Sequence, residues 1–104
     1  MAVTREHRAM VTDHAIVRWL ERVEGYDFDD IREELGPKGK ISMDTRILNY
    51  LANKYGLFRG HVIYRIATKQ VRNAIKIGAK KVHRGNQTLV INGGVVVTLV
   101  PRKR

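Results

Sequence analysis

The sequence of 104 residues contains no cysteine. Without thiols the chain can form no disulfide, no thiolate zinc site and no cysteine nucleophile. It also has no apolar run near the roughly 20 residues that cross a bilayer, and residues 1–12 lack the apolar stretch of a secretory signal. These absences predict a cytoplasmic protein that does not enter a membrane.

Acidic residues are almost missing from the later two thirds of the chain. Residues 1–35 carry nine acidic and five basic side chains, a net charge of −4. Residues 36–104 carry fifteen basic side chains and Asp44 alone, a net charge of +14. A basic segment this dense favours a polyanion over a neutral metabolite as the partner. The competing interpretation is a solvated surface, but clustered charge indicates nucleic acid more than total charge does.

Length and composition predict a single domain. A chain of 104 residues has room for one modest core, and 43% hydrophobic residues do not resemble a disordered composition. We expect residues 1–104 to form this domain, with flexible ends at 1–12 and 102–104. The four histidines do not have the spacing of a metal site, so we expect no metal and no cofactor.

Capping residues and the helical spacing of apolar side chains predict four helices. Their ranges are 13–24, 28–35, 43–55 and 69–77, with N-caps at Thr12, Asp27, Ser42 and Thr68. Tyr26 and Ile31 are placed as a hydrophobic staple around the second helix start. In the helix at 69–77, apolar Val71, Ala74 and Ile75 should face inward, which leaves its outer face basic.

The remaining segments predict an antiparallel sheet. Turn signals at Gly85-Asn86 and Asn92-Gly93-Gly94 separate strands at 80–84, 88–91 and 95–100, a three-stranded meander. The last strand is apolar nearly throughout, which favours a central position. Residues 57–66 fit either a helix or a strand, and their β-branched and aromatic content favours a fourth strand. The expected fold is α+β, with N-terminal helices packed on a C-terminal antiparallel sheet.

One helix face carries residues suited to RNA cleavage. His14, Arg18, Glu21 and Arg22 lie at positions i, i+4, i+7 and i+8 of the first helix. A histidine can act as general acid or base, while arginines hold the scissile phosphate without a metal. The competing interpretation is an ion-paired helix face, with Glu21 bound to Arg18 or Arg22, and this is the commoner case.

Two segments carry a resemblance to known proteins. Thr12–Asp27 and Thr88–Pro101 resemble small phage and prophage proteins that pair an HAxxRxLERV helix with a GVVVTVL strand. The helix followed by a terminal sheet is also distantly similar to ribonuclease toxins of the BrnT and RelE-like type. That similarity implies a metal-independent endoribonuclease fold. If the chain is an enzyme, the chemistry of its side chains makes His14 the candidate acid or base, with Arg18, Arg22 and Arg84 on the phosphate. Residues 38–79 depart from both patterns, so no role there is implied by resemblance.

The largest set of candidate binding residues lies after residue 58. His61, Tyr64 and Arg65 form one cluster, and His83 with Arg84 forms another. Interleaved aromatic and basic side chains can stack a base and grip a phosphate, although packing of Tyr64 in a sheet is an equal alternative. The full predicted nucleic-acid set is Arg59, His61, Tyr64, Arg65, Lys69, Arg72, Lys76, Lys80, Lys81, His83 and Arg84. RNA is the preferred partner.

Two other functions compete with RNA binding. Leu51–Leu57 followed by Val62 has the spacing of a helix-turn-helix, which would place Arg59, His61 and Arg65 in the major groove of DNA. A small phage accessory protein can instead bind and inhibit a host or defence protein, because charged surfaces also steer protein partners. The complementary −4 and +14 regions also allow a homodimer.

Overall fold

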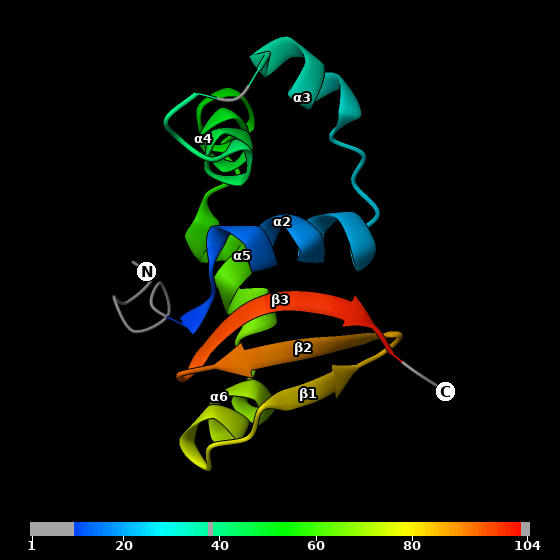
Figure 1. Cartoon of the computed structure of the whole chain (residues 1–104), viewed down its shortest axis with the longest axis vertical. Coiled ribbons are helices and arrows are strands. Elements are labelled where there is room, and N and C mark those ends of the chain that lie inside the picture. The colour runs from blue at the N-terminus through cyan, green and yellow to red at the C-terminus, as the bar shows by residue number, and fades with distance from the viewer. Residues whose placement is uncertain (1–9, 38, 103–104) are drawn as a thin grey trace.

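The computed structural model describes residues 10–37 and 39–102, and within them the α+β expectation is confirmed. Helices come first and the sheet comes last along the chain (Figure 1). The elements are α2 (Asp13–Arg22), α3 (Asp29–Leu35), α4 (Met43–Tyr55), α5 (Arg59–Ile66), α6 (Lys69–Lys76), β1 (Lys81–Arg84), β2 (Gln87–Asn92) and β3 (Val95–Pro101). No described helix is long and apolar enough to cross a membrane.

Three of the four predicted N-caps are confirmed. The side chains of Thr12, Ser42 and Thr68 accept hydrogen bonds from backbone N–H groups in the first turns of α2, α4 and α6. The fourth prediction is off by one residue, because the N-cap of α3 is Phe28. Asp27 instead accepts a bond from the backbone N–H of Asp29 at 2.9 Å, as in an Asx turn. Phe28 is only 1% exposed, so its burial fixes where α3 begins.

The expected strand at 57–66 is wrong, since residues 59–66 form helix α5. Val62, Ile63 and Ile66 lie at helical spacing and are all buried. The β-branched side chains therefore fill a helix face, and tertiary burial outweighs their preference for strands. Gly56, with φ 68° and ψ 19°, ends α4 in the left-handed conformation and turns the chain toward α5.

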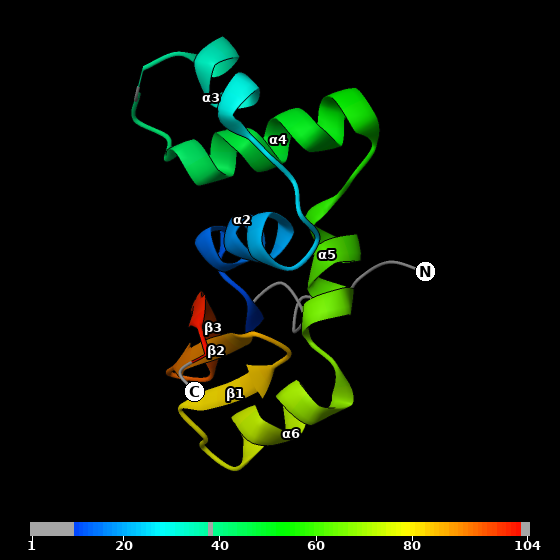
Figure 2. The same cartoon turned by 90° about the vertical axis from the view of Figure 1, so that its right-hand side faces the viewer.

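The sheet contains three strands in the order β1-β2-β3, so the possible fourth strand is absent from the described residues. The prediction that the apolar last strand is central is wrong, because β2 is central and β3 lies at an edge. Helix α2 lies along that edge in Figures 1 and 2, and Val11 forms a parallel bridge with Val96. The apolar edge strand is therefore covered by the chain itself.

A bulge in β3 allows two side chains of this strand, three positions apart, to face the core. Val90 pairs with Thr98 and Ile91 pairs with Val96, which leaves Val97 as an extra residue on β3. Val96 and Leu99 are three positions apart, yet both are buried. In a regular strand they would face opposite sides, so the bulge brings both onto the core.

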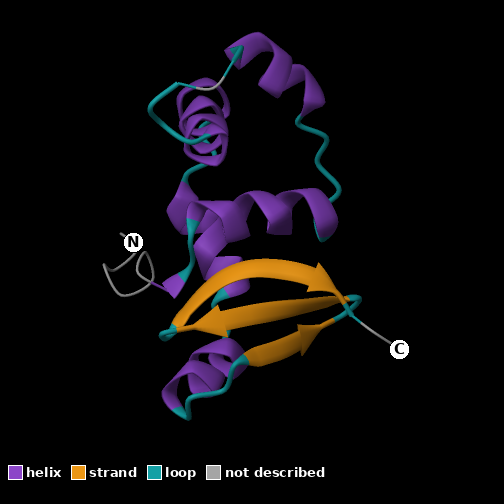
Figure 3. Ribbon diagram, in the orientation of Figure 1, coloured by secondary structure: helices purple, strands orange, loops and turns teal. Residues whose placement is uncertain are grey.

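The molecule is arranged in layers along its longest axis. Helices α3 and α4 form one end, α2 and α5 the middle, and the sheet with α6 the other end (Figure 2). Figure 3 shows the strands between α6, which lies below them, and the other helices above them. The core runs through the middle layer, where Ala15, Ile16, Leu20 and Ile66 have no exposed surface, and it continues into α4, where Ile47 is equally buried.

The sequence predicts flexible chain ends, but the described parts of these ends make specific contacts. Val11 is 4% exposed, and the N–H of Thr12 donates to the Val96 carbonyl at 3.0 Å. The N–H of Arg102 donates to the Asn86 carbonyl at 2.7 Å. Residues 1–9, 103 and 104, to which the same expectation applied, lie outside the described residues.

Candidate nucleic-acid interface

The predicted catalytic face of α2 is bound to three different elements. His14 Nδ1 lies 2.9 Å from Asp44 Oδ2 at the start of α4. Glu21 accepts bonds from Arg18 at 3.1 Å and from Arg32 of α3 at 2.9 Å. Arg22 donates to the Leu99 carbonyl of β3. The Arg18–Glu21 pair agrees with the interpretation of this surface as an ion-paired helix face. The second arginine bound to Glu21 is Arg32 of α3 and not Arg22.

Helix α5 follows α4 after a short turn, as the helix-turn-helix alternative requires, but its two arginines are engaged. Arg59 donates to both carboxylate oxygens of Asp13, at 2.9 and 3.1 Å. Arg65 Nε lies 3.2 Å from Glu24 Oε2, which also accepts a bond from Trp19 Nε1 at 2.7 Å. These carboxylates neutralise the charges that a recognition helix would present to DNA.

The aromatic residues of α5 face solvent. Tyr64 is 71% exposed, so the alternative in which it packs in a sheet is wrong. His61 is exposed and lies against the ring of Phe58, with the ring centroids 5.8 Å apart. Tyr64 is therefore accessible for stacking on an unpaired base.

The lysines and arginines of α6 and the start of β1 form a basic face. Val71 is buried and Ala74 and Ile75 pack against the core, as predicted. The opposite side of α6 and the residues leading into β1 expose the five members of the basic face, namely Lys69, Arg72, Lys76, Lys80 and Lys81. Within residues 10–37 and 39–102, none of these five forms an ion pair.

The exposed carboxylates of α3 lie at the other end of the molecule. The sequence has no Asp or Glu after Asp44, and the exposed carboxylates Asp29, Asp30, Glu33 and Glu34 are all on α3. Helix α3 and helix α6 are at opposite ends of the long axis (Figure 1). The exposed carboxylates of α3 and the basic face are therefore separated in space, although Lys40, Arg46 and Lys54 of the basic segment lie near α3.

The predicted pair His83 and Arg84 points to the two faces of the sheet, as neighbours on a strand do. His83 is exposed, and its Nδ1 lies 2.8 Å from Thr88 Oγ1. Arg84 turns toward the helices and donates to the Ile66 carbonyl at 3.2 Å. Its guanidinium carbon lies 4.9 Å from the centroid of the Trp19 ring, within the range of a cation–π contact.

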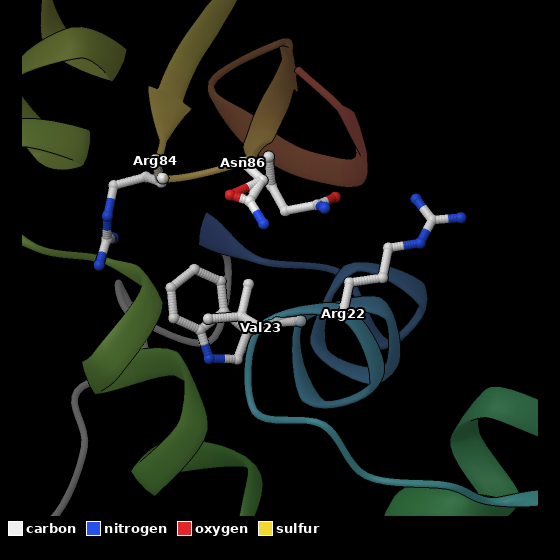
Figure 4. Close-up of a pocket in the computed structure, with 7 residues that line it drawn as sticks. Arg22, Val23, Arg84 and Asn86 are labelled. Carbon is white, nitrogen blue, oxygen red and sulfur yellow. The ribbon is translucent and has the colours of Figure 1, made fainter.

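Arg84 and Arg22 line opposite sides of a pocket of about 250 Å³ between the end of α2 and the turn that joins β1 to β2. We call it the turn pocket, and Figure 4 shows its residues. The lining consists of Trp19, Arg22, Val23, Arg84, Gly85, Asn86 and Gln87. Sequence reasoning missed Asn86 and Gln87, because a turn dipeptide and a strand start carry no signal of a pocket.

The described residues contain no group of three or more His, Asp or Glu side chains that could hold a metal ion. The chain matches no protein-family model, and neither the search of curated proteins nor that of solved structures gives a match. The resemblance to phage proteins and to BrnT and RelE-like toxins therefore stays a prediction.

Proposed function

We propose that this protein binds nucleic acid, with RNA preferred to DNA, through the basic face of α6 and β1. The observation that carries the proposal is the set of five exposed cations without an ion-pair partner among the described residues. Lys69, Arg72 and Lys76 follow the spacing i, i+3 and i+7, which aligns them in a row along one side of α6. A row of cations can follow a phosphate backbone.

The contrast with the other basic residues supports this location. Arg18, Arg32, Arg59 and Arg65 each contact a carboxylate, so their charges are largely neutralised within the fold. Within the described residues, the basic face forms no such contact with a carboxylate. Unpaired cations attract counterions that a polyanion releases on binding, and this release drives association.

The exposed aromatic residue of α5 favours RNA. Single-stranded RNA offers unstacked bases, and aromatic side chains bind them by stacking. Tyr64 lies only a few residues before α6 and is 71% exposed. In contrast, the engaged Arg59 and Arg65 weaken the case for reading duplex DNA. RNA binding would place the protein in the cytoplasm of its cell, or of the host cell if a phage encodes it.

The proposal predicts a strong dependence of RNA affinity on salt. If about five cations contact phosphates, the affinity for single-stranded RNA should fall on the order of 10²-fold between about 50 and 200 mM salt. The double variant Arg72→Ala/Lys76→Ala should weaken binding at low salt and reduce the slope of log K against log salt by about 1.4. Fluorescence anisotropy with a labelled RNA measures both quantities.

A matched control removes the same charge from the opposite end of the molecule. Lys40 and Lys54 are exposed, and the bond from Lys54 to the Tyr50 hydroxyl raises the lysine pKa, so this side chain is charged at neutral pH. Lys40→Ala/Lys54→Ala should leave the slope unchanged. Equal slopes for the two double variants, or no binding at low salt, would overturn the proposal. Tighter binding to duplex DNA than to RNA would favour the helix-turn-helix alternative.

A further inference from the structure

The groove between α3 and α4 offers exposed apolar surface beside a carboxylate. Its volume is about 520 Å³, within the range of about 300–1,000 Å³ that is common for binding pockets. It lies at the start of α3 and the end of α4, and its described lining includes Tyr26, Asp27, Ile31, Leu51 and Tyr55. Both tyrosines are exposed, and Asp27 is the one charged member of the described lining. Exposed aromatic rings beside a hollow are typical of a surface that binds another protein. We call this feature the α3–α4 groove.

The charge around the α3–α4 groove is negative. Asp27 and Asp30 are exposed and form no ion pair within the described residues. The third carboxylate at this end of α3 is held by an arginine of the same helix. Lys54 lies nearby, but it shares the Tyr50 hydroxyl with Glu34, at 2.9 and 2.7 Å, so Glu34 balances its charge locally. A partner with exposed cations therefore suits this groove.

Ile77 gives the basic face an apolar side chain that can fill such a groove. It is the C-cap residue of α6 and is 82% exposed, more than any other large hydrophobic residue that the structure describes. Lys76 precedes it, and Lys80 and Lys81 follow it closely. Residues 69–81 carry five basic side chains and no carboxylate, a net charge of +5. A single exposed apolar residue is ordinary, but this one is surrounded by cations.

The α3–α4 groove and Ile77 lie far apart in one molecule. Figures 1 and 2 show α3 and α4 at one end and α6 at the other, and the longest extent of the molecule is 40 Å. The Ile77 of a folded chain therefore cannot enter the groove of that same chain. A contact between the two surfaces requires a second copy.

We infer that copies of this protein bind one another, with Ile77 of one copy in the α3–α4 groove of the next and the basic face against the carboxylates of α3. The rings of Tyr26 and Tyr55 provide apolar surface for the isoleucine, so water leaves both sides of the contact. Opposite charges around it steer the encounter and fix its orientation. Two grooves facing each other would bring carboxylates together, and two basic faces would bring cations together, so neither pairing of like surfaces is favoured.

This contact goes beyond the proposed function and competes with it. Nucleic acid on the basic face would cover the cations that the contact uses. RNA that binds there should therefore release single copies from the associated form.

Sedimentation equilibrium of the full chain measures the association. The mass should rise with protein concentration above the 11.9 kDa of one copy. A limit of two copies indicates an antiparallel pair with both contacts formed, and a continuing rise indicates a chain of copies. About 1 M sodium chloride shortens the screening length to about 3 Å and should weaken the association. A mass that stays at one copy up to about 1 mM protein, or an association that salt leaves unchanged, would refute the inference.

Substitutions on either surface should prevent association. Ile77→Ser removes the apolar side chain and should weaken association about tenfold or more, as expected when one large apolar residue is no longer buried. Tyr55→Lys places a cation in the groove against the basic face and should have a similar effect. Both residues are exposed, so both variants should fold, which circular dichroism can verify. Ile41→Ser is the matched control, because Ile41 is 54% exposed and is not in the described lining of the groove. Association that survives Ile77→Ser, or that Ile41→Ser weakens equally, would contradict the assignment.

Mixing the two variants tests whether the surfaces are complementary. The Ile77→Ser protein keeps its groove, and the Tyr55→Lys protein keeps its isoleucine. Each variant alone should remain a single copy, whereas an equal mixture should form pairs that contain one copy of each. Pairs of like surfaces would not be restored in this way. A mixture that stays at the mass of one copy would therefore show that Ile77 does not enter the groove.

RNA binding and self-association fail independently. Ile77→Ser should leave RNA affinity unchanged at protein concentrations too low for self-association, whereas Arg72→Ala/Lys76→Ala should weaken both. If no RNA binds but the mixed variants form pairs, the proposed function fails and the contact between copies stands. If RNA binds and the mixture forms no pairs, the contact between copies is wrong and the proposed function stands.

Discussion

Replacing Phe28 by alanine should lower the free energy of unfolding by about 3–5 kcal/mol, the usual cost of removing a buried aromatic ring. Phe28 is 1% exposed and is among the largest fully buried side chains. It lies with Ile31 of α3 and Leu51 of α4 at the groove between these helices. Neither helix can shift to fill the space without losing contacts with the middle layer, so we expect most of the cavity to persist. Urea denaturation monitored by circular dichroism measures the change.

The ring that stacks on Phe28 provides the matched control. Tyr26 lies 5.8 Å from Phe28 between ring centroids, but it is 44% exposed. Tyr26→Ala should therefore cost only about 1 kcal/mol, since an aromatic contact adds roughly 0.5–1.5 kcal/mol. The melting temperature of Phe28→Ala should fall by at least about 12 °C, because a domain of this size shifts by about 4–8 °C per kcal/mol. Equal losses for the two variants would contradict the role assigned to Phe28.

Helix starts could be predicted because they depend on neighbouring residues. The caps at Thr12, Ser42 and Thr68 each bind a backbone N–H three positions later. Such a bond needs only the local sequence, and the chemistry of the side chain identifies it. The error at Asp27 has the opposite origin. Burial of Phe28 against a distant helix sets the start of α3, and no local signal carries that information.

The errors at 57–66 and in β3 also come from contacts between distant parts of the chain. Val62 and Ile63 favour a strand by composition, but burial and the bond between Arg59 and Asp13, 46 positions away, stabilise a helix there. The apolar sequence of β3 indicated burial, which holds for Val96 and Leu99 but not for Val100, which is 41% exposed. It could not show that α2 rather than another strand covers the edge, since both environments select the same side chains.

For the candidate site, too, the sequence predicts what depends on neighbouring residues and not what depends on distant ones. The basic outer side of α6 follows from helical spacing, so Lys69, Arg72 and Lys76 could be placed from the sequence. That they form no ion pair within the described residues could not be predicted, because distant carboxylates decide which arginines are paired, as Asp13 does for Arg59 and Glu24 for Arg65. The turn pocket was unpredictable for the same reason, since 62 positions separate Arg22 from Arg84.

Replacing Asp13 by alanine should cost about 2–3 kcal/mol of unfolding free energy. Its carboxylate accepts bonds from Arg59 of α5 and, at 2.7 Å, from the Thr45 hydroxyl of α4. The variant breaks both links and leaves a half-buried guanidinium without its anion, which costs more than the loss of a surface pair. Both partners are about 30% exposed, at 29% and 32%, so screening by water keeps the loss below that of a fully buried pair. Denaturation in urea at neutral pH measures it.

The same carboxylate should make stability depend on pH. Burial raises the pKa of Asp13, but the bonds from Arg59 and Thr45 and the charge of Arg59 together hold that pKa below its ordinary value of 3.8. A lowered pKa stabilises the fold above the unfolded value, and this contribution disappears as the pH falls from about 4 through the folded pKa. Asp13→Asn should flatten that part of the pH profile. Asp29→Asn is the matched control, since Asp29 also begins a helix but is 84% exposed and lies 3.4 Å from Arg32. An unchanged profile in Asp13→Asn, or equal flattening by both variants, would show that the link between α2, α4 and α5 does not depend on the charge of Asp13.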